Sequence, residues 1–274
     1  MVPKRALCIH DMSTIGRCSL TVISPVLSTM GIQVVALPTA VLSTHFGGFG
    51  TPAMQDLTSF CSDALAHYKQ LGETFDCVFS GFLSSPQQMQ IVKDAFELSK
   101  GGLKLCDPVM ADHGKLYSSI TPELVEGFKD LCHHSDLIVP NPTEAQILLD
   151  RDYTKLVFSK EEATEIVKAL GDKYNSVIIT GTKFDDGSVC CVGYDKKENE
   201  VFFIPLNYTP VSYPGTGDMF GACLAANILD GCDLKSACEN SARFIEKVVE
   251  ETYKTGSDTK YGVHIEPMLK YLIK

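Results

Sequence analysis

The sequence predicts a three-layer α/β/α fold, in which helices cover both faces of a central, mostly parallel β-sheet. Short apolar or β-branched runs alternate with longer stretches of helical period, which is typical of strands joined by crossover helices. Within each short run the apolar positions are consecutive, as expected of a strand covered on both faces. No linker rich in Pro, Gly and Ser interrupts the sequence. We therefore expect one domain spanning residues 1–274.

Six apolar runs are the expected parallel strands. They lie at residues 5–9, 33–38, 77–81, 103–107, 137–139 and 177–180. Two further strand-like runs within residues 188–206 flank a turn at residues 195–199 and predict a late hairpin. Helices are expected between the strands, where Pro52, Pro86 and Ser159 lie near their first turns. Their ranges are residues 53–71, 86–100, 160–174 and 233–254.

Residues 41–51 break the alternation because they are rich in Gly, Ser and Thr. Glycines allow hinge motion, and a segment that closes over a site can exclude water during a reaction. We therefore expect this segment to be a small lid.

The composition argues against several classes of protein. Lys and Arg number 24 against 34 Asp and Glu, and the formal net charge of −10 disfavours a protein that coats nucleic acid or an anionic membrane. The N-terminus lacks the apolar segment of a secretory signal, and no later apolar run approaches ~18 residues. The 11 cysteines are scattered through apolar segments. We expect most of them to be buried free thiols in a cytoplasmic protein.

Polar or small residues lie at the ends of several expected strands. They are Asp11, Gly81, Asp107, Asn141 and Thr180. Ligands of open α/β sheets bind at the carboxyl ends of the strands. These residues therefore predict that the functional site lies along one edge of the sheet.

The most informative motif is Gly215, Thr216, Gly217 and Asp218, followed by an Ala- and Leu-rich stretch that reads as a helix to Leu229. Free backbone N–H groups at a helix start bind anions, and glycines let a phosphate approach closely. A carboxylate beside them can accept the proton of an attacking hydroxyl. The motif favours an anion hole with Asp218 as catalytic base, although a plain turn before a helix explains the tetrapeptide alone about as well.

This loop is neither a P-loop nor a dinucleotide-binding G-x-G-x-x-G motif. It resembles the anion-hole motif of ribokinase-like kinases. Two further segments, CDPVMAD at residues 106–112 and PNPTE at residues 140–144, are similar to segments of the vitamin B6 kinases in that superfamily. The stretch LPTAVLSTHFGG at residues 37–48 resembles the pyridoxal kinases in particular. The order of these matches implies a ribokinase-like fold and a pyridoxal kinase activity.

The resemblance implies roles for the residues on the phosphate side. Asp107 and Glu144 would hold Mg²⁺ directly or through water, since this cation prefers oxygen ligands. Asp112, Asn141 and Thr180 would contact ATP, with Asn141 donating to a phosphate oxygen. A polar strand end explains Thr180 almost as well. A monovalent cation such as K⁺ is implied by the resemblance alone.

On the acceptor side, the resemblance implies that Asp11, His45, Gly47 and Phe82 bind the substrate. A carboxylate opposite a pyridine nitrogen would favour the pyridinium form. Phe82 can stack on the ring. His45 can bridge substrate and phosphate, or it can be satisfied within its own loop.

Four residues depart from the usual pyridoxal-kinase pattern. Asp11 replaces Ser, Phe46 replaces Thr, and Gly48 and Phe82 each replace Tyr. The hydroxyls of the usual Thr and Tyr residues could otherwise form hydrogen bonds with the substituents of the substrate. The choice among pyridoxal, pyridoxamine, pyridoxine and hydroxymethylpyrimidine therefore stays open.

The leading interpretation is a homodimeric kinase that transfers the γ-phosphate of MgATP to the 5′-hydroxymethyl group of a B6 vitamer. The nearest alternative is a hydroxymethylpyrimidine kinase, followed by a sugar kinase. A catalytically silent pyridoxal-phosphate-binding protein and an interaction domain without a small-molecule site are alternatives of other classes. No nucleic-acid or membrane partner is expected.

Overall fold

The computed structural model describes residues 2–99, 101–207 and 209–273, which form a ten-stranded sheet and a separate two-stranded hairpin. The strands of the sheet are β1 (Arg5–Ile15), β2 (Gln33–Thr44), β3 (Met54–Asp56), β4 (Cys77–Ser80), β5 (Leu103–Cys106), β8 (Leu137–Ile138), β9 (Val157–Phe158), β10 (Ser176–Phe184), β11 (Val189–Asp195) and β12 (Glu200–Pro205). The hairpin consists of β6 (Ala111–Asp112) and β7 (Lys115–Leu116).

The strand order in the sheet is β12-β11-β10-β8-β5-β4-β1-β2-β3, with β9 beside β10. Neighbours from β10 through to β2 are parallel, whereas β3, β11 and β12 run antiparallel to their neighbours. The predictions of a mostly parallel sheet and a late hairpin are therefore confirmed. Because β1 lies between β4 and β2, its carboxyl end falls within the edge where ligands of such sheets bind.

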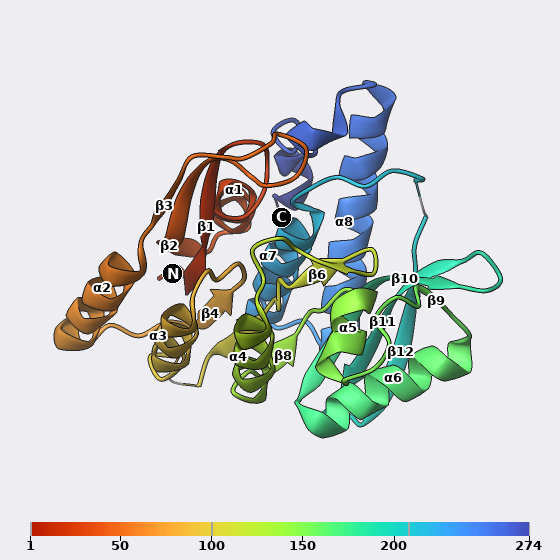
Figure 1. The fold of residues 1–274 in the computed structure, drawn as a ribbon, viewed down its shortest axis with the longest axis horizontal. Helices are drawn as coiled ribbons and strands as arrows, with labels where there is room; N and C mark the ends of the chain where they lie inside the picture. Colours follow the sequence, from red (N-terminus) through yellow and green to blue (C-terminus); the bar gives the residue numbers. More distant parts are fainter. Residues whose placement is uncertain (1, 100, 208, 274) are drawn as a thin grey trace.

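Helices cover both faces of the sheet. They are α1 (Leu20–Thr29), α2 (Thr58–Leu71), α3 (Pro86–Phe96), α4 (Pro122–His133), α5 (Pro142–Leu148), α6 (Lys160–Lys173), α7 (Thr216–Leu229) and α8 (Leu234–Lys254), with 3-10 turns η1 (Thr259–Tyr261) and η2 (Leu269–Leu272). Helices α1, α7 and α8 contribute to the core on one face, and α2 to α6 to the core on the other (Figure 1). The three-layer prediction is confirmed.

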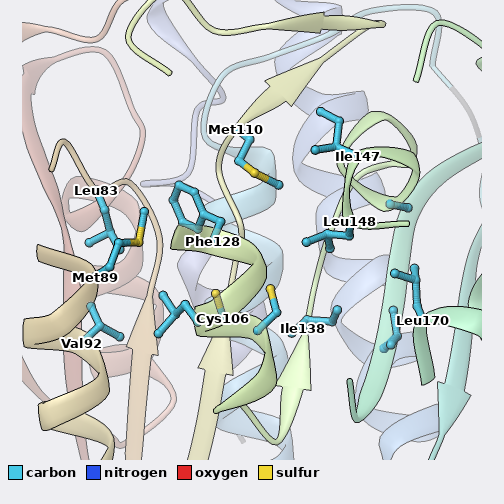
Figure 2. Packing of buried hydrophobic residues seen from close by; sticks show 14 of the residues in the cluster. Leu83, Met89, Val92, Cys106, Met110, Phe128, Ile138, Ile147, Leu148 and Leu170 are labelled. Atoms are coloured by element: carbon cyan, nitrogen blue, oxygen red, sulfur yellow. The ribbon is translucent and has the colours of Figure 1, made fainter. Parts of the chain in front are cut away.

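Each face of the sheet has its own apolar core. Figure 2 shows part of one core, where Phe128 of α4 and Leu148 of α5 lie over Cys106 and Ile138 of the sheet. On the other face, α7 packs so closely that a Cβ at its Gly221 would lie 2.5 Å from a ring atom of Phe79 on β4. This close approach fixes the start of α7 relative to the ends of the central strands.

Three strands are longer than their apolar runs predicted. β1 continues past the expected end at residue 9 to Ile15, β2 past residue 38 to Thr44, and β10 past residue 180 to Phe184. In the added part of β1, exposed Met12 is followed by buried Ser13, so no consecutive apolar run marks it. The predicted lid therefore begins inside β2.

The helix predicted from residue 53 begins at Thr58 instead. The three residues of β3 pair with β2, and the Oδ1 atom of Asp56 then accepts the backbone N–H of Thr58 at 2.9 Å. An acidic side chain at this place satisfies a free N–H of the first turn. Pro52 was the wrong start signal because it precedes a strand.

Helices α3, α6 and α8 confirm three predicted helices with small shifts at their ends. α3 ends at Phe96, and its predicted end, Lys100, lies outside the described residues. Helix α1 was not predicted, because it contains Pro25 and its N-cap residue, Ser19, makes no capping bond through its side chain. Within the described ranges, no helix is long and apolar enough to cross a bilayer.

Candidate active site

The Gly-Thr-Gly-Asp motif forms the start of α7. Gly215 is the N-cap residue, with a φ of 81° that glycine adopts without strain. A Cβ at this position would lie 2.0 Å from the carbonyl oxygen of Arg17. Thr216 is held by a bond of 3.0 Å from its hydroxyl to the carbonyl of Tyr213. The free N–H groups of this helix start are therefore held in a fixed place, as an anion hole requires.

Asp218 lies in the first turn of α7, with 15% of its side chain exposed. Its Oδ2 atom accepts the backbone N–H of Ser19, the residue before α1, at 2.8 Å. Burial raises the pKa of Asp218 to about 7, which the N–H of Ser19 opposes and the charge of Asp11 increases. A carboxylate whose pKa lies near physiological pH suits a general base.

Asp11 is connected to the same network. The hydroxyl of Ser19 donates to its Oδ1 atom, and the hydroxyl of Ser13 donates to Oδ2 at 2.9 Å. Burial raises the pKa of Asp11, and these two hydroxyls oppose the rise. Asp11 thus supports Ser19, which in turn holds Asp218. A contact between Asp11 and a substrate stays a prediction.

Asp107 follows β5 and faces the same loop. A Cβ at Gly217 would lie 3.8 Å from the Oδ2 atom of Asp107. Burial raises the pKa of Asp107 well above its ordinary range, and the charges of Glu144 and Asp218 add to the rise. These three carboxyl groups concentrate negative charge around Asp107, which a cation would neutralise.

Glu144 is fully engaged by backbone groups. Its Oε1 atom accepts the N–H groups of Met110 and Ala111, at 2.9 and 3.3 Å, and its Oε2 atom accepts that of Asn141 at 2.9 Å. Burial raises the pKa of Glu144 to about 8, against the effect of these three bonds. Glu144 therefore clamps the loop after β5 to the start of α5. Ligation of a metal by Glu144 stays a prediction.

Asn141 is the N-cap residue of α5 and shares a capping box with Glu144. Its side-chain oxygen accepts the N–H groups of Thr143 and Glu144, and its amide nitrogen donates to the carbonyl of Ala111 at 2.6 Å. Asp112 lies on β6 with 39% of its side chain exposed, and its Oδ1 atom accepts the N–H of His113 at 2.7 Å. Asn141 and Asp112 thus lie close to Glu144, and their contacts with ATP stay predictions.

A cavity of about 230 Å³ adjoins the anion hole. Thr180 and Gly181 of β10 and Thr216 and Gly217 of the motif contribute to its wall. The structure therefore brings Thr180, which is distant in sequence, to the same site. Its position beside a bulge in β10 is consistent with the predicted role at the nucleotide.

The rest of this cavity was missed by sequence reasoning. Its wall is largely apolar, and the contributing side chains come from the segment after β12 and from α7 and α8. They include Leu206, Val211, Phe220, Ala242, Ile245 and Val249. Asn207 and Glu246 lie at the same cavity, joined by a bond of 2.7 Å from the N–H of Asn207. The spacing of Ile245 and Val249 on one helix face is the only sequence signal for this slot.

The predicted lid packs against the C-terminal part of the chain. The Nε2 atom of His45 lies 2.7 Å from the carbonyl oxygen of Lys260, and its Nδ1 atom accepts the N–H of Gly47 at 3.0 Å. Since Nδ1 accepts, the proton is on Nε2. Both nitrogens are therefore satisfied by backbone groups. One of these groups lies in the loop of His45 and the other in the distant turn η1, and a substrate contact from His45 stays a prediction.

The lid contributes one ring of an aromatic pair. Phe46, which is 42% exposed, lies with its ring centroid 6.3 Å from that of Phe82, in the loop after β4. The carbonyl of Phe82 accepts the hydroxyl of Thr39 on β2 at 3.0 Å. Gly47 and Gly48 are exposed, and a Cβ at Gly48 would lie 3.1 Å from Cβ of Lys260. Two of the four departures from the pyridoxal-kinase pattern thus form one aromatic pair.

Comparison with known proteins places this site in a family. The sequence model of the family described as phosphomethylpyrimidine kinase matches residues 68–263. Pyridoxal kinase PdxY of Actinobacillus pleuropneumoniae is 27% identical over 252 residues, covering 83% of this chain and 82% of its own length.

Solved structures agree with the sequence comparison. A Bacteroides thetaiotaomicron protein assigned as a phosphomethylpyrimidine kinase and crystallised with pyridoxal is 35% identical, with a TM-score of 0.94, over 100% of this chain and 96% of its own. Pyridoxal kinase from Lactobacillus plantarum is 29% identical, with a TM-score of 0.89, over 98% and 96%. The ribokinase-like fold is confirmed, and the chain belongs to the phosphomethylpyrimidine kinase family of the ribokinase-like superfamily.

Proposed function

We propose that the protein is an ATP-dependent pyridoxal kinase. The observation that carries this proposal is the place of Asp218, whose raised pKa, recessed carboxylate and neighbouring anion hole form one unit at the start of α7. The apolar cavity beside the motif suits a purine base. Relatives named pyridoxal kinase, and a similar structure crystallised with pyridoxal, support the choice of acceptor.

In the proposed reaction, the 5′-hydroxymethyl oxygen of pyridoxal attacks the γ-phosphorus of ATP. A new oxygen–phosphorus bond forms, the bond from γ-phosphorus to the β–γ bridging oxygen breaks, and ADP leaves. Asp218 accepts the hydroxyl proton, while the N–H groups at Gly215, Thr216 and Gly217 stabilise the charge on the transferred group. The segment at residues 41–51 would exclude water from this step.

The residues present fit a Mg²⁺ ion that keeps most of its water and phosphate ligands. Asp107 offers a carboxylate at the anion-hole loop, and the charges of Glu144 and Asp218, which raise the pKa of Asp107, support a cation at this place. The oxygens of Glu144 already accept three N–H groups, so Glu144 would act through water. Within residues 2–99, 101–207 and 209–273, no three His, Cys, Asp or Glu side chains gather as a metal cluster. When bound, the ion would neutralise phosphate charge. The K⁺ requirement stays a prediction.

Phosphorylation of hydroxymethylpyrimidine is the second candidate. The description of the matching family favours it, as does that of the similar Bacteroides structure. The acceptor half also differs from the usual pyridoxal-kinase pattern at Phe46 and Phe82. These two rings offer an aromatic surface on which either a pyridine or a pyrimidine can stack.

A panel of acceptors tests both candidates. ADP release is measured with MgATP and, in turn, pyridoxal, pyridoxamine, pyridoxine and hydroxymethylpyrimidine, each at a range of concentrations. We expect the highest kcat/KM for a B6 vitamer. A higher value for the pyrimidine would replace the first candidate by the second. Binding of pyridoxal phosphate without turnover of any acceptor would favour the silent binding protein.

The proposed enzyme is a homodimer that works in the cytoplasm, where ATP is available. Exposed apolar side chains support the dimer, because they gather on the extension formed by β1, β2 and β3. They are Met12, Ile15 and Met54. Apolar groups on one projecting edge are typical of a surface that a second copy covers. Light scattering measures the assembly directly, and a mass of one chain would contradict it.

A further inference from the structure

His10 is a buried polar side chain that the proposed reaction does not use. It lies on β1 directly before Asp11, and it has no exposed surface. Among the described residues, neither of its ring nitrogens has a well-formed hydrogen bond, although the backbone of Phe79 lies near enough to oppose the fall of its pKa. Burial lowers the pKa of His10 to about 3, so the ring is neutral and carries a single N–H at physiological pH. An unpaired buried donor costs folding free energy. A role in function would explain this cost.

The neighbours of His10 direct its ring toward the candidate base. Its Nδ1 atom lies 3.7 Å from the Oδ1 atom of Asp218. The ring packs edge-on against Phe79 of β4, with centroids 4.4 Å apart. Gly81 leaves the space that the ring fills, since a Cβ there would lie 2.2 Å from Nδ1. Phe79 and Gly81 therefore hold the ring with Nδ1 toward the carboxylate.

We propose that His10 is a positioning residue, which donates its Nδ1–H to Oδ1 of Asp218 when the site closes around its substrates. The proposal rests on the function proposed above. The N–H of Ser19 already fixes Oδ2 of Asp218 at 2.8 Å. A second donor at Oδ1 would stop the carboxylate from rotating about its last bond. Hydrogen bonds of catalytic groups are often long in free enzymes and shorten in the complex with substrate.

The proton balance of the reaction is unchanged by this role. His10 keeps its proton throughout, and the proton of the acceptor hydroxyl goes to Asp218 as ADP leaves. The contribution of His10 is the direction in which the receiving oxygen points. Orientation of this kind acts on the chemical step, so its loss lowers kcat more than it raises KM.

Two substitutions separate positioning from packing. His10→Phe keeps a ring against Phe79 but removes both nitrogens, and we expect kcat to fall about tenfold. Its melting temperature should equal or exceed that of the wild type, because two unpaired nitrogens leave the core. His10→Asn places an N–H donor where Nδ1 was. We expect it to recover kcat to within about threefold of the wild type, although its smaller side chain leaves a void and lowers the melting temperature.

A packing role predicts the opposite order of activities, with His10→Phe above His10→Asn, and that order would overturn the proposal. In the Asp218→Asn background, His10→Phe should cause no further loss, whereas a second tenfold loss would show that His10 acts independently of Asp218. Ser99→Ala is the matched control, because it also removes an unpaired buried polar atom but lies in the segment after α3. Its kcat should stay at the wild-type value.

A spectroscopic readout keeps the test independent of the acceptor. Imidazole ¹⁵N spectra of the protein with MgADP should show His10 as the neutral Nδ1–H tautomer. An Nε2–H tautomer would refute the role of His10 even if the kinase is active. Absence of turnover with every acceptor, together with an Nδ1–H signal, would instead refute the proposed function and leave His10 paired with Asp218.

Discussion

The phosphate half and the acceptor half of the site are built in different ways. The phosphate half consists mainly of backbone: Gly215 caps α7, and Asp218 lies three residues later in its first turn. The acceptor half is assembled from side chains of distant segments. Its His45 is bonded to a carbonyl 215 residues away, and its Phe46 faces Phe82 across the mouth of the lid. The anion hole and the catalytic base are thus local in sequence, whereas the recognition of the acceptor is not.

This difference shows how one fold can serve several acceptors. The helix start positions the transferred phosphate, and one carboxylate deprotonates the acceptor hydroxyl, whatever the rest of the alcohol. The acceptor half can change through single side chains without disturbing that unit. Substitutions confined to one half should therefore leave the kinetic constants of the other half unchanged.

Asp218→Asn should produce the largest effect. The amide keeps the shape and the bond to Ser19 but accepts no proton, so we expect kcat to fall by about 10²–10⁴. The KM values for ATP and pyridoxal should stay within about threefold. Steady-state kinetics measure all three quantities, and a thermal melt confirms that the variant is folded. A kcat near the wild-type value would remove Asp218 as the base.

The pH profile gives the same base a second test. Because Asp218 acts in its ionised form and burial raises its pKa to about 7, kcat/KM of the wild type should rise as pH passes about 7. This limb should be absent from Asp218→Asn. The free energy of unfolding should change with pH in the opposite direction. A folded carboxyl with a raised pKa binds its proton more tightly than the same carboxyl in the unfolded chain. The contribution of Asp218 to stability therefore falls as pH rises from about 4 to 7.

Gly215→Ala should produce the next largest effect, on stability and on activity together. The new methyl group would meet the carbonyl of Arg17 at 2.0 Å, at a φ of 81°. Gly231→Ala is the matched control, because its φ is 94° but nothing lies within 4 Å of its Cβ. We expect Gly231→Ala to cost about 1–2 kcal/mol of unfolding free energy and Gly215→Ala about 1–3 kcal/mol more. Equal costs, from denaturant titrations, would mean that the close approach to Arg17 is unimportant.

Phe82→Leu should produce the smallest effect, confined to the acceptor half. Leucine keeps apolar volume but loses the ring, so we expect the KM for pyridoxal to rise about fivefold. The KM for ATP should not change, because Phe82 does not line the cavity beside the anion hole. Phe60→Leu, at an exposed ring on α2, is the control. If both KM values rise together, the two halves of the site are coupled.

The sequence predicted the parts of the fold that follow from short-range rules. Consecutive apolar runs located the central strands, and the order of the polar strand ends located Asp107, Asn141 and Thr180 on one edge. The extension of β1 to Ile15 was not predictable in this way, because its burial depends on pairing with β2. The helix start at Thr58 was missed because it depends on the side chain of Asp56, which follows a strand.

Within the site, the motif was predictable and its supports were not. The link from Asp11 through Ser19 to Asp218 joins two segments about 200 residues apart, and no spacing rule connects them. The apolar slot beside the anion hole was hidden for the same reason. Its side chains belong to a loop and two helices that are apolar for packing as well. Only the three-dimensional structure distinguishes the apolar side chains that line the cavity from those that fill the core.

The bond between His45 and the carbonyl of Lys260 has a consequence for the synthesis of the protein. A ribosome makes the lid before α7 and before the turn at η1 that receives His45. The carboxyl end of the central strand β1 is enclosed only after α7 and η1 have both been made. A nascent chain therefore carries an unfinished catalytic centre. This centre is complete only after η1 has been made and has received His45.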